Sequence, residues 1–286
     1  MTELLQTLIF GIATGAVISL SAVGLSLSYG VTRFINFSYG EFLTLGAYLT
    51  VLFVGLGLPL PAAILVGMLA VGVTGVVLAR IFFDPLMRRG FLPLLVTSVG
   101  LAFVLQNLVR MIAGSNPIRF PLPLMRPWHV GALFVPKIPV LVVAVALAAM
   151  LFTHLLLTFT RIGKMMRATS DNPALARASG IATARVLAAT WFLSAAIGAL
   201  GGVLLAMTQI ALQPVMGWSF LLVVFAAVLL GGIGNPYGAM LGSLIVGLGI
   251  ELGTSYLSPD YGHAFAFAIL VLVLLIRPSG LLRGAF

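Results

Sequence analysis

Side chains that could support acid–base, nucleophilic or metal chemistry are few in this chain and stand far apart. The sequence holds six Asp and Glu, three His and no Cys. His129, His154 and His263 fall in separate segments, without the His-x-x-x-His spacing or neighbouring carboxylate that metal sites use. The lack of Cys excludes thiolate nucleophiles and disulfides. We therefore predict no catalytic residue, no metal site and no enzymatic activity for this chain.

A phosphate-cradling nucleotide loop is also excluded. Gly163 and Lys164 form the one Gly-Lys pair of the sequence, and Met165 follows where Ser or Thr would hold magnesium. The sequence therefore predicts no ATP site and no cofactor on this chain.

Two acidic residues, Glu41 and Glu251, lie inside long apolar runs. A charge in the hydrocarbon region of a membrane is costly, so such side chains usually face a bundle interior or a cavity. Either residue could belong to a transport pathway. The structural alternative is that helix donors or a buried Arg hold the carboxylate, which then only orients the helices.

The longest polar and basic stretch covers residues 161–185. Asp171 or Asn172 can cap a helix there, Pro173 suits its first turn, and Gly180 is placed to end it. The pattern predicts a short amphipathic helix along one membrane face. Such a helix could rest on anionic lipid or dock into a soluble partner, and its composition alone favours lipid slightly.

The elements that must carry these residues are transmembrane helices. Hydrophobic residues make up 61% of the 286 residues and charged residues 7%, whereas a soluble domain has roughly 25% charged residues. A helix needs about 20 apolar residues to cross a hydrocarbon core of about 30 Å. Nine segments fit this description: 8–29, 35–56, 62–83, 92–113, 138–159, 186–210, 218–234, 238–257 and 264–276. We predict an all-α polytopic membrane protein with eight to ten membrane elements, the last three segments being short or broken candidates.

The basic residues report orientation. Assigning alternate loops to one side gathers eleven of the fifteen Lys and Arg, namely Arg33, Arg80, Arg88, Arg89, Arg161, Lys164, Arg167, Arg177, Arg185, Arg277 and Arg283. The other side keeps Arg110, Arg119, Arg126 and Lys137. The positive-inside rule then places residues 160–185 and the C-terminus in the cytoplasm, and the N-terminus outside if the count is nine.

The remaining segments predict one membrane domain covering residues 1–286. Residues 114–138 hold Pro117, Pro121, Pro123, Pro127 and Pro136, too many for a helix interior, and are expected to form an external, partly ordered loop. Glycines also recur four apart, which favours close helix packing within the chain over subunit dimerisation. These pairs are Gly11 and Gly15, Gly198 and Gly202, Gly238 and Gly242, and Gly249 and Gly253.

Several segments together resemble a known family. Residues 27–30 (LSYG), 35–42 (INFSYGEF) and 46–48 (GAY) resemble the N-terminal signature of ABC importer permeases for branched-chain amino acids, of the LivH type. Residues 163–181 resemble the cytoplasmic coupling loop of these permeases, residues 231–239 (GGIGNPYGA) their glycine-rich turn, and residues 276–281 (IRPSGL) their C-terminal end. The chain departs from the family at Ser38 and Tyr39, where Ala-His is common, so no role of that histidine carries over.

The resemblance implies a permease subunit that translocates branched-chain amino acids across the bacterial inner membrane. It implies a second homologous permease, two cytoplasmic ATPases that bind ATP and magnesium, and a periplasmic or extracellular solute-binding protein as partners. Nucleic acid is not expected. It further implies that the ATPase docks on a coupling segment of Arg167, Asp171, Pro173, Ala174, Arg177 and Gly180. We predict a substrate pathway near short or broken helices, at Asn36, Gly40, Glu41, Gly231 and Gly232, although the last two could form only a tight turn.

Other functions fit the sequence less well. An ion-coupled carrier or a channel usually needs intramembrane ionisable residues, and Glu41 and Glu251 offer little for that purpose. A membrane-embedded enzyme needs clustered His, Asp or Cys near one bilayer face. Within the family, the substrate could be leucine, isoleucine and valine, a broader set of amino acids, or urea and short amides.

Overall fold

The computed structural model describes residues 2–87, 89–122, 127–130, 133–256, 258, 261–277 and 280–282. Some of the predictions fall outside these described parts. They concern Arg88, Arg126, Arg283 and Pro123, residues 278–279, and the side chains of His129 and His263.

All nine predicted apolar segments are helices. They are α1 (Thr2–Thr32), α2 (Tyr39–Gly55), α3 (Leu60–Leu78), α4 (Phe91–Ala113), α5 (Lys137–Phe159), α8 (Thr183–Gln209), α9 (Met216–Gly231), α10 (Pro236–Tyr256) and α11 (Gly262–Ile276). A π-helical segment, η1 (Ala79–Phe83), continues α3, and two shorter helices, α6 (Arg161–Asp171) and α7 (Pro173–Ala178), connect α5 to α8. The predicted all-α polytopic architecture is confirmed.

The short helices differ in part from those predicted. Among the described residues, six helices are long and apolar enough to span a membrane, and α2, α9 and the apolar part of α11 are shorter. Predicting 35–56 as one continuous span was wrong, because α2 begins only at Tyr39. Of the three segments predicted as short or interrupted by glycine, 238–257 falls in α10, one unbroken helix of 21 residues whose glycines serve packing.

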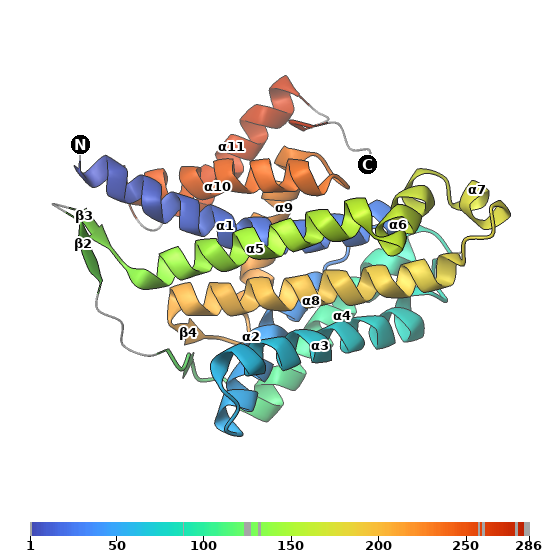
Figure 1. Cartoon of the computed structure of the whole chain (residues 1–286), viewed down its shortest axis with the longest axis horizontal. Helices are drawn as coiled ribbons and strands as arrows, with labels where there is room; N and C mark the ends of the chain where they lie inside the picture. Colours follow the sequence, from blue (N-terminus) through green and yellow to red (C-terminus); the bar gives the residue numbers. More distant parts are fainter. Residues whose placement is uncertain are drawn as a thin grey trace.

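Most helices run lengthwise through the molecule (Figure 1). The long helix α1 contacts α10, α8, α5 and α9 along its length, so it forms the centre of the bundle. The N-terminus lies at the end that carries strands β2 (Trp128–Val130) and β3 (Leu133–Val135), and α6 and α7 lie at the opposite end (Figure 1). The helix α9 crosses behind α1 at a steep angle, which brings its side chains against the end of α1.

The predicted glycine pairs pack helices of this chain together. A side chain at Gly11 or Gly15 would strike Leu248 or Leu244 of α10. Gly198 and Gly202 of α8 face α2, Gly238 and Gly242 of α10 face α9, and Gly249 and Gly253 face α11. The prediction of helix packing within the chain is therefore confirmed at all four pairs.

The described residues of the proline-rich segment before α5 are not helical, as predicted, but they are more ordered than expected. Strand β1 (Ile118–Arg119) pairs with β4 (Ala211–Leu212), and β2 pairs with β3, both antiparallel. The β1–β4 pairing ties this segment to the end of α8.

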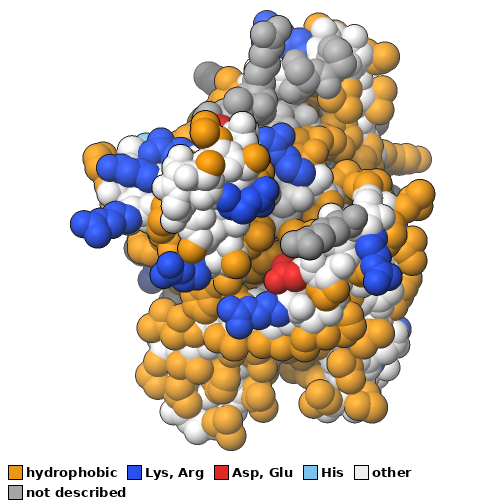
Figure 2. All heavy atoms as spheres, turned by 90° about the vertical axis from the view of Figure 1, so that its right-hand side faces the viewer, with side chains coloured by type: hydrophobic (Ala, Val, Ile, Leu, Met, Phe, Trp, Pro, Cys, Tyr) orange, Lys and Arg blue, Asp and Glu red, His pale blue; other side chains and the backbone are white. Residues whose placement is uncertain are grey.

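The opposite end of the molecule is basic. Figure 2 shows Lys and Arg side chains gathered on this end, while hydrophobic side chains dominate the flanks. The helices α6 and α7 and the start of α8 contribute Arg161, Lys164, Arg167, Arg177 and Arg185. Of the other predicted set, Arg110 and Lys137 lie at the end of α4 and the start of α5, toward the strands.

Candidate functional site

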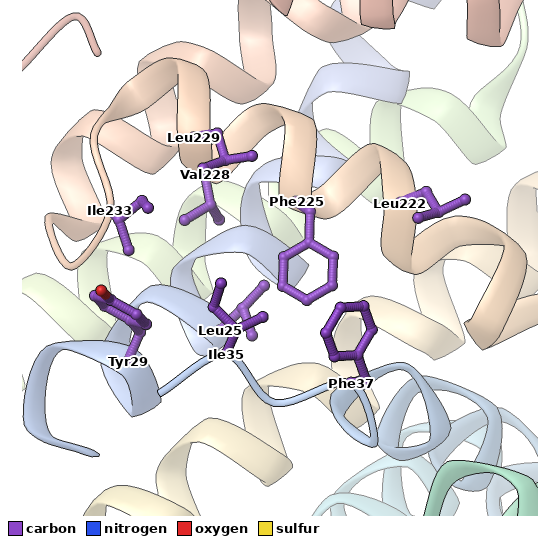
Figure 3. A pocket seen from close by; sticks show the side chains of 9 residues that line it. All are labelled: Leu25, Tyr29, Ile35, Phe37, Leu222, Phe225, Val228, Leu229 and Ile233. Carbon is purple, nitrogen blue, oxygen red and sulfur yellow. The ribbon is translucent and has the colours of Figure 1, made fainter. Parts of the chain in front are cut away.

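An apolar pocket opens between the end of α1, the connection from α1 to α2, and α9 (Figure 3). Its volume is about 240 Å³. The lining side chains are aliphatic or aromatic, and the one polar group they carry is the hydroxyl of Tyr29. They are Leu25, Tyr29, Ile35, Phe37, Leu222, Phe225, Val228, Leu229 and Ile233. Such a lining suits a branched aliphatic group better than a polar one.

The connection between α1 and α2, residues 33–38, forms one wall because it is not helical. Arg33 adopts a left-handed backbone, with φ of 59°, and its N–H donates to Tyr29 O at 2.8 Å to close α1. Asn36 Oδ1 accepts from the Ser38 N–H at 3.0 Å and from Ser38 Oγ at 2.7 Å. These bonds hold Asn36 away from the pocket, while its neighbours Ile35 and Phe37 line it.

Aromatic contacts brace the pocket. The ring of Phe37 lies 5.2 Å from that of Phe225 and 6.5 Å from that of Trp218, measured between centroids. Trp218 in turn lies 5.3 Å from Phe103 of α4. Aromatic pairs at these separations are favourable, so the 33–38 wall and the α9 wall are held at a defined spacing.

The predicted pathway residues lie behind this pocket and do not line it. Asn36 and Glu41 are buried, with 1% and 0% of their surface exposed. Gly40 packs against Gly217 at the start of α9. Gly231 ends α9 against Gly238, and Gly232 begins the following turn with φ of 110°. A pathway at these five positions stays a prediction, and the structure adds that residues next to two of them, Asn36 and Gly232, form the pocket wall.

The two intramembrane acids differ in their surroundings. Glu251 Oε1 accepts from Thr14 Oγ1 at 2.7 Å, which joins α10 to α1 and favours the structural alternative for this residue. Both carboxylate oxygens of Glu41 are buried without a hydrogen-bond partner among the described residues. Glu41 lies in the first turn of α2, where the helix dipole favours a negative charge.

The predicted short helix exists as α7. The cap is Asn172 and not Asp171, because Asn172 Oδ1 accepts from the N–H groups of Ala174 and Leu175 at 3.1 and 3.0 Å. Gly180, with φ of 83°, ends the helix as predicted. Its N–H donates to Arg177 O at 3.0 Å, and the next N–H donates to Ala176 O at 3.0 Å, the pairing of a Schellman motif.

The surface of α7 is open. Asp171, Pro173, Ala174, Arg177 and Gly180 are all exposed, and Arg167 is half-buried on α6. Leu175 is 63% exposed, although it is a large apolar side chain. A large exposed apolar side chain near Arg177 suits contact with a protein partner or with lipid.

The helix α6 was missed at the sequence level. Thr160 caps it by accepting from the Gly163 N–H at 3.1 Å. Its buried face holds Gly163, Met166, Thr169 and Ser170. The spacing of three and four residues between them is the signal that could have revealed this helix.

Among the described residues, no group of three His, Asp or Glu side chains could hold a metal ion. His154 of α5 makes a 2.7 Å hydrogen bond to Tyr237 of α10 through Nδ1 and the phenol oxygen. This histidine therefore joins two helices.

Helices of membrane-spanning length and a basic end are typical of a polytopic membrane protein. The family described as branched-chain amino acid transport system / permease component matches residues 7–274. The chain belongs to this family.

Several relatives are similar to this chain over nearly its full length. The high-affinity branched-chain amino acid transport system permease protein LivH of Escherichia coli (strain K12) is 32% identical over 97% of this chain and 95% of its own. BraD of Pseudomonas aeruginosa, named as a permease of the same kind of system, is 29% identical over 97% of this chain and 95% of its own. A probable LivH of Methanocaldococcus jannaschii is 28% identical over 92% of this chain and 87% of its own. No solved structure matches the chain.

Proposed function

We propose that this chain is the membrane-spanning permease subunit of an ATP-driven importer of branched-chain, hydrophobic amino acids. The observation that carries the substrate class is the apolar pocket between α1 and α9. The aliphatic side chain of a passing amino acid would contact this lining, and its polar ends would stay outside it. Apolar pockets discriminate by the apolar area they cover, at about 1–3 kcal/mol per methylene.

The basic end serves the ATPases in this proposal. Closure of the nucleotide sites on two separate cytoplasmic ATPase subunits, which hold ATP and magnesium, would push on α7 through Leu175 and Arg177, with Arg167 on the adjoining turn of α6. The capping by Asn172 supports this role, because it keeps α7 rigid while most of its surface is exposed. Hydrolysis is thus assigned to the partners and translocation to this chain.

Sidedness follows from the charges. The basic end, with residues 160–185, would face the cytoplasm, and the strand end would face the periplasm or the outside. The position of Gly280–Leu282 beside the end of α9 supports a cytoplasmic C-terminus. The N-terminus at the strand end is then outside (Figure 1). A solute-binding protein would deliver substrate at that face, and a second, homologous permease would complete the pathway.

The alternatives fit the pocket less well. Urea, short amides and polar amino acids need hydrogen-bonding groups, and the lining supplies one hydroxyl, that of Tyr29. An ion-coupled carrier needs an accessible ionisable residue within the membrane, whereas Glu251 is bonded to Thr14 and Glu41 is fully buried.

The test is uptake of labelled leucine into vesicles that hold this chain with its partner permease, ATPases and binding protein. Leu222→Ala removes side-chain volume from the pocket, and Leu151→Ala is its control on α5, since the two leucines are 50% and 58% exposed. We expect ATP-dependent uptake that falls about tenfold in Leu222→Ala and stays unchanged in Leu151→Ala. Uptake without ATP would refute the proposal of an ATP-driven importer. Uptake of urea in place of leucine would refute branched-chain amino acids as the substrate class. Equal effects of the two variants would refute contact between the pocket and the substrate.

A further inference from the structure

The last turn of α6 is bonded to the last turn of α1. Ser170 Oγ donates to Gly30 O at 2.6 Å, and the backbone carbonyl of Ser170 accepts from Arg33 Nη2 at 2.6 Å. One residue of α6 thus both donates to and accepts from the end of α1. These three residues, Ser170, Gly30 and Arg33, are called the α6–α1 junction below.

The junction is held in a defined geometry. Ser170 is 6% exposed and Gly30 is buried, so neither the Ser170 hydroxyl nor the Gly30 carbonyl can turn to water without cost. Carbonyls in the last turn of a helix have no partner inside that helix, and Ser170 satisfies the one at Gly30. The guanidinium of Arg33 also places a positive charge at the C-terminal end of α1, where the helix dipole favours it.

The junction lies between the exposed helix α7 and the pocket. On one side, Ser170 stands two residues before Asn172, the cap of α7. On the other side, Tyr29 precedes Gly30 directly and Ile35 follows Arg33 by two residues, and both line the pocket (Figure 3). A displacement of α6 and α7 therefore reaches the pocket wall through a few bonded residues.

The backbone of Arg33 marks the point where this wall can change. A left-handed conformation is uncommon outside glycine and persists where surrounding contacts impose it. Here it ends α1 and starts the irregular 33–38 segment. Its side chain is tied to α6, so a shift of α6 changes the restraint on this residue.

We propose that the α6–α1 junction transmits movement of α6 and α7 to the pocket, with Ser170 and Arg33 as positioning residues that couple ATP hydrolysis to transport. This inference rests on the proposed function in one respect, namely that an ATPase docks on α7. Neither residue contacts the ATPase or the substrate in this mechanism. Loss of the junction leaves ATP hydrolysis running without a corresponding change at the pocket.

The experiment reports on the pocket without any solute. The chain has no cysteine, so Ile35→Cys places the one thiol of this chain in the pocket wall, and labelling is read on this chain after separation from its partners. Its rate of modification by N-ethylmaleimide is measured with and without ATP and magnesium, alongside ATP hydrolysis. We expect ATP to change the rate at least about fivefold, the lower range of typical coupling between sites.

Two variants break the junction and one leaves it intact. Ser170→Ala removes the bond to Gly30, and Arg33→Asn removes the guanidinium while keeping a residue that tolerates the left-handed backbone. Thr169→Val is the matched control, because Thr169 is 3% exposed and its hydroxyl bonds only within α6, to Met165 O at 2.8 Å. We expect the ATP effect to drop below about twofold in the first two variants, with hydrolysis preserved, and to persist in Thr169→Val.

Several results would overturn the junction. These are an ATP effect that persists in both Ser170→Ala and Arg33→Asn, an equal loss in Thr169→Val, a parallel loss of hydrolysis, or no ATP effect in the parent Ile35→Cys complex. Arg33 is exposed, so its variant supplies the test even where Ser170→Ala impairs assembly. If leucine uptake fails while ATP still changes the modification rate, leucine is refuted as a substrate and the proposed role of the α6–α1 junction is not affected.

Discussion

The contact between the first turns of α2 and α9 can be tested by adding one methyl group. A Cβ at Gly217 would collide with the carbonyl oxygen of Gly40 and with Thr44 Oγ1. Thr44 Oγ1 also accepts a 3.1 Å hydrogen bond from the Gly217 N–H, and this bond is buried. The change Gly217→Ala therefore crowds backbone against backbone and displaces the one side chain that satisfies this N–H.

The size of the effect follows from these two terms. Overpacking a core costs about 1–3 kcal/mol, and a buried N–H left without its partner costs about 1–3 kcal/mol. We expect Gly217→Ala to lose roughly 2–6 kcal/mol of unfolding free energy. Because α9 and the 33–38 connection that leads into α2 both form pocket walls, leucine uptake should fall as well.

The assay is unfolding by SDS titration in mixed micelles, followed by circular dichroism. Gly100→Ala on α4 is the control, because a Cβ there meets nothing within 4 Å. Alanine is favoured over glycine in a helix by about 0.5–1 kcal/mol, so this control should unfold at the same or a higher SDS fraction. Equal unfolding midpoints for Gly217→Ala and Gly100→Ala would refute the close approach of α2 and α9.

Three further predictions concern single side chains. Asn172→Ala removes the cap of α7, which is worth about 1 kcal/mol, and should weaken co-purification of the ATPase. The control Asn107→Ala loses only a bond within α4 and should leave co-purification unchanged. Equal recovery of the ATPase with both variants would refute the role of the cap. Arg177→Glu and Pro173→Gly should each reduce ATP-dependent uptake with the permease pair still assembled on native gels, and normal uptake in both would refute docking on α7. Glu41→Gln should leave the SDS midpoint unchanged or raise it, because no described group bonds the carboxylate and burying a charge is costly; a lower midpoint would show that the charge is stabilising.

Much of the fold could be predicted because its signals are local. Apolar length alone located the nine long apolar helices of the described residues, and the Asn172-Pro173 pair located α7. Glycines four apart indicated packing surfaces, since only close backbone approach explains them on apolar helices. Each of these signals is contained in a few residues of sequence.

The pocket could not be predicted because its determinants are tertiary. Ile35 and Phe37 are apolar, so hydropathy extends the second span through them, and the break depends on the conformation of Arg33 and on the bonds between Asn36 and Ser38. The helix α9 is apolar all round and carries no periodic signal that separates its pocket face from its buried face. The sequence therefore predicted pathway residues that lie beside the pocket, and it did not predict the residues that line it.

The end of α1 is also where the glycine-rich turn after α9 packs. A Cβ at Gly234 would lie 3.6 Å from Gly30 Cα and 3.6 Å from the ring of Tyr29. Gly30 is therefore flanked by this turn and by Ser170 of α6. Two segments that resemble the permease family, the glycine-rich turn and the coupling loop, thus meet on a third, the end of α1.

The C-terminal segment completes this arrangement. The N–H groups of Leu281 and Leu282 donate to the carbonyls of Leu230 and Gly231 at 2.8 and 3.1 Å, and so cap the end of α9. A Cβ at Gly280 would lie 2.8 Å from Gly232 N, which leaves room only for glycine. The fourth resembling segment therefore fixes the turn that packs on α1. These four stretches, distant in sequence, meet at the end of α1 beside the pocket, so a change at residues 280–282 should act on the pocket through α9.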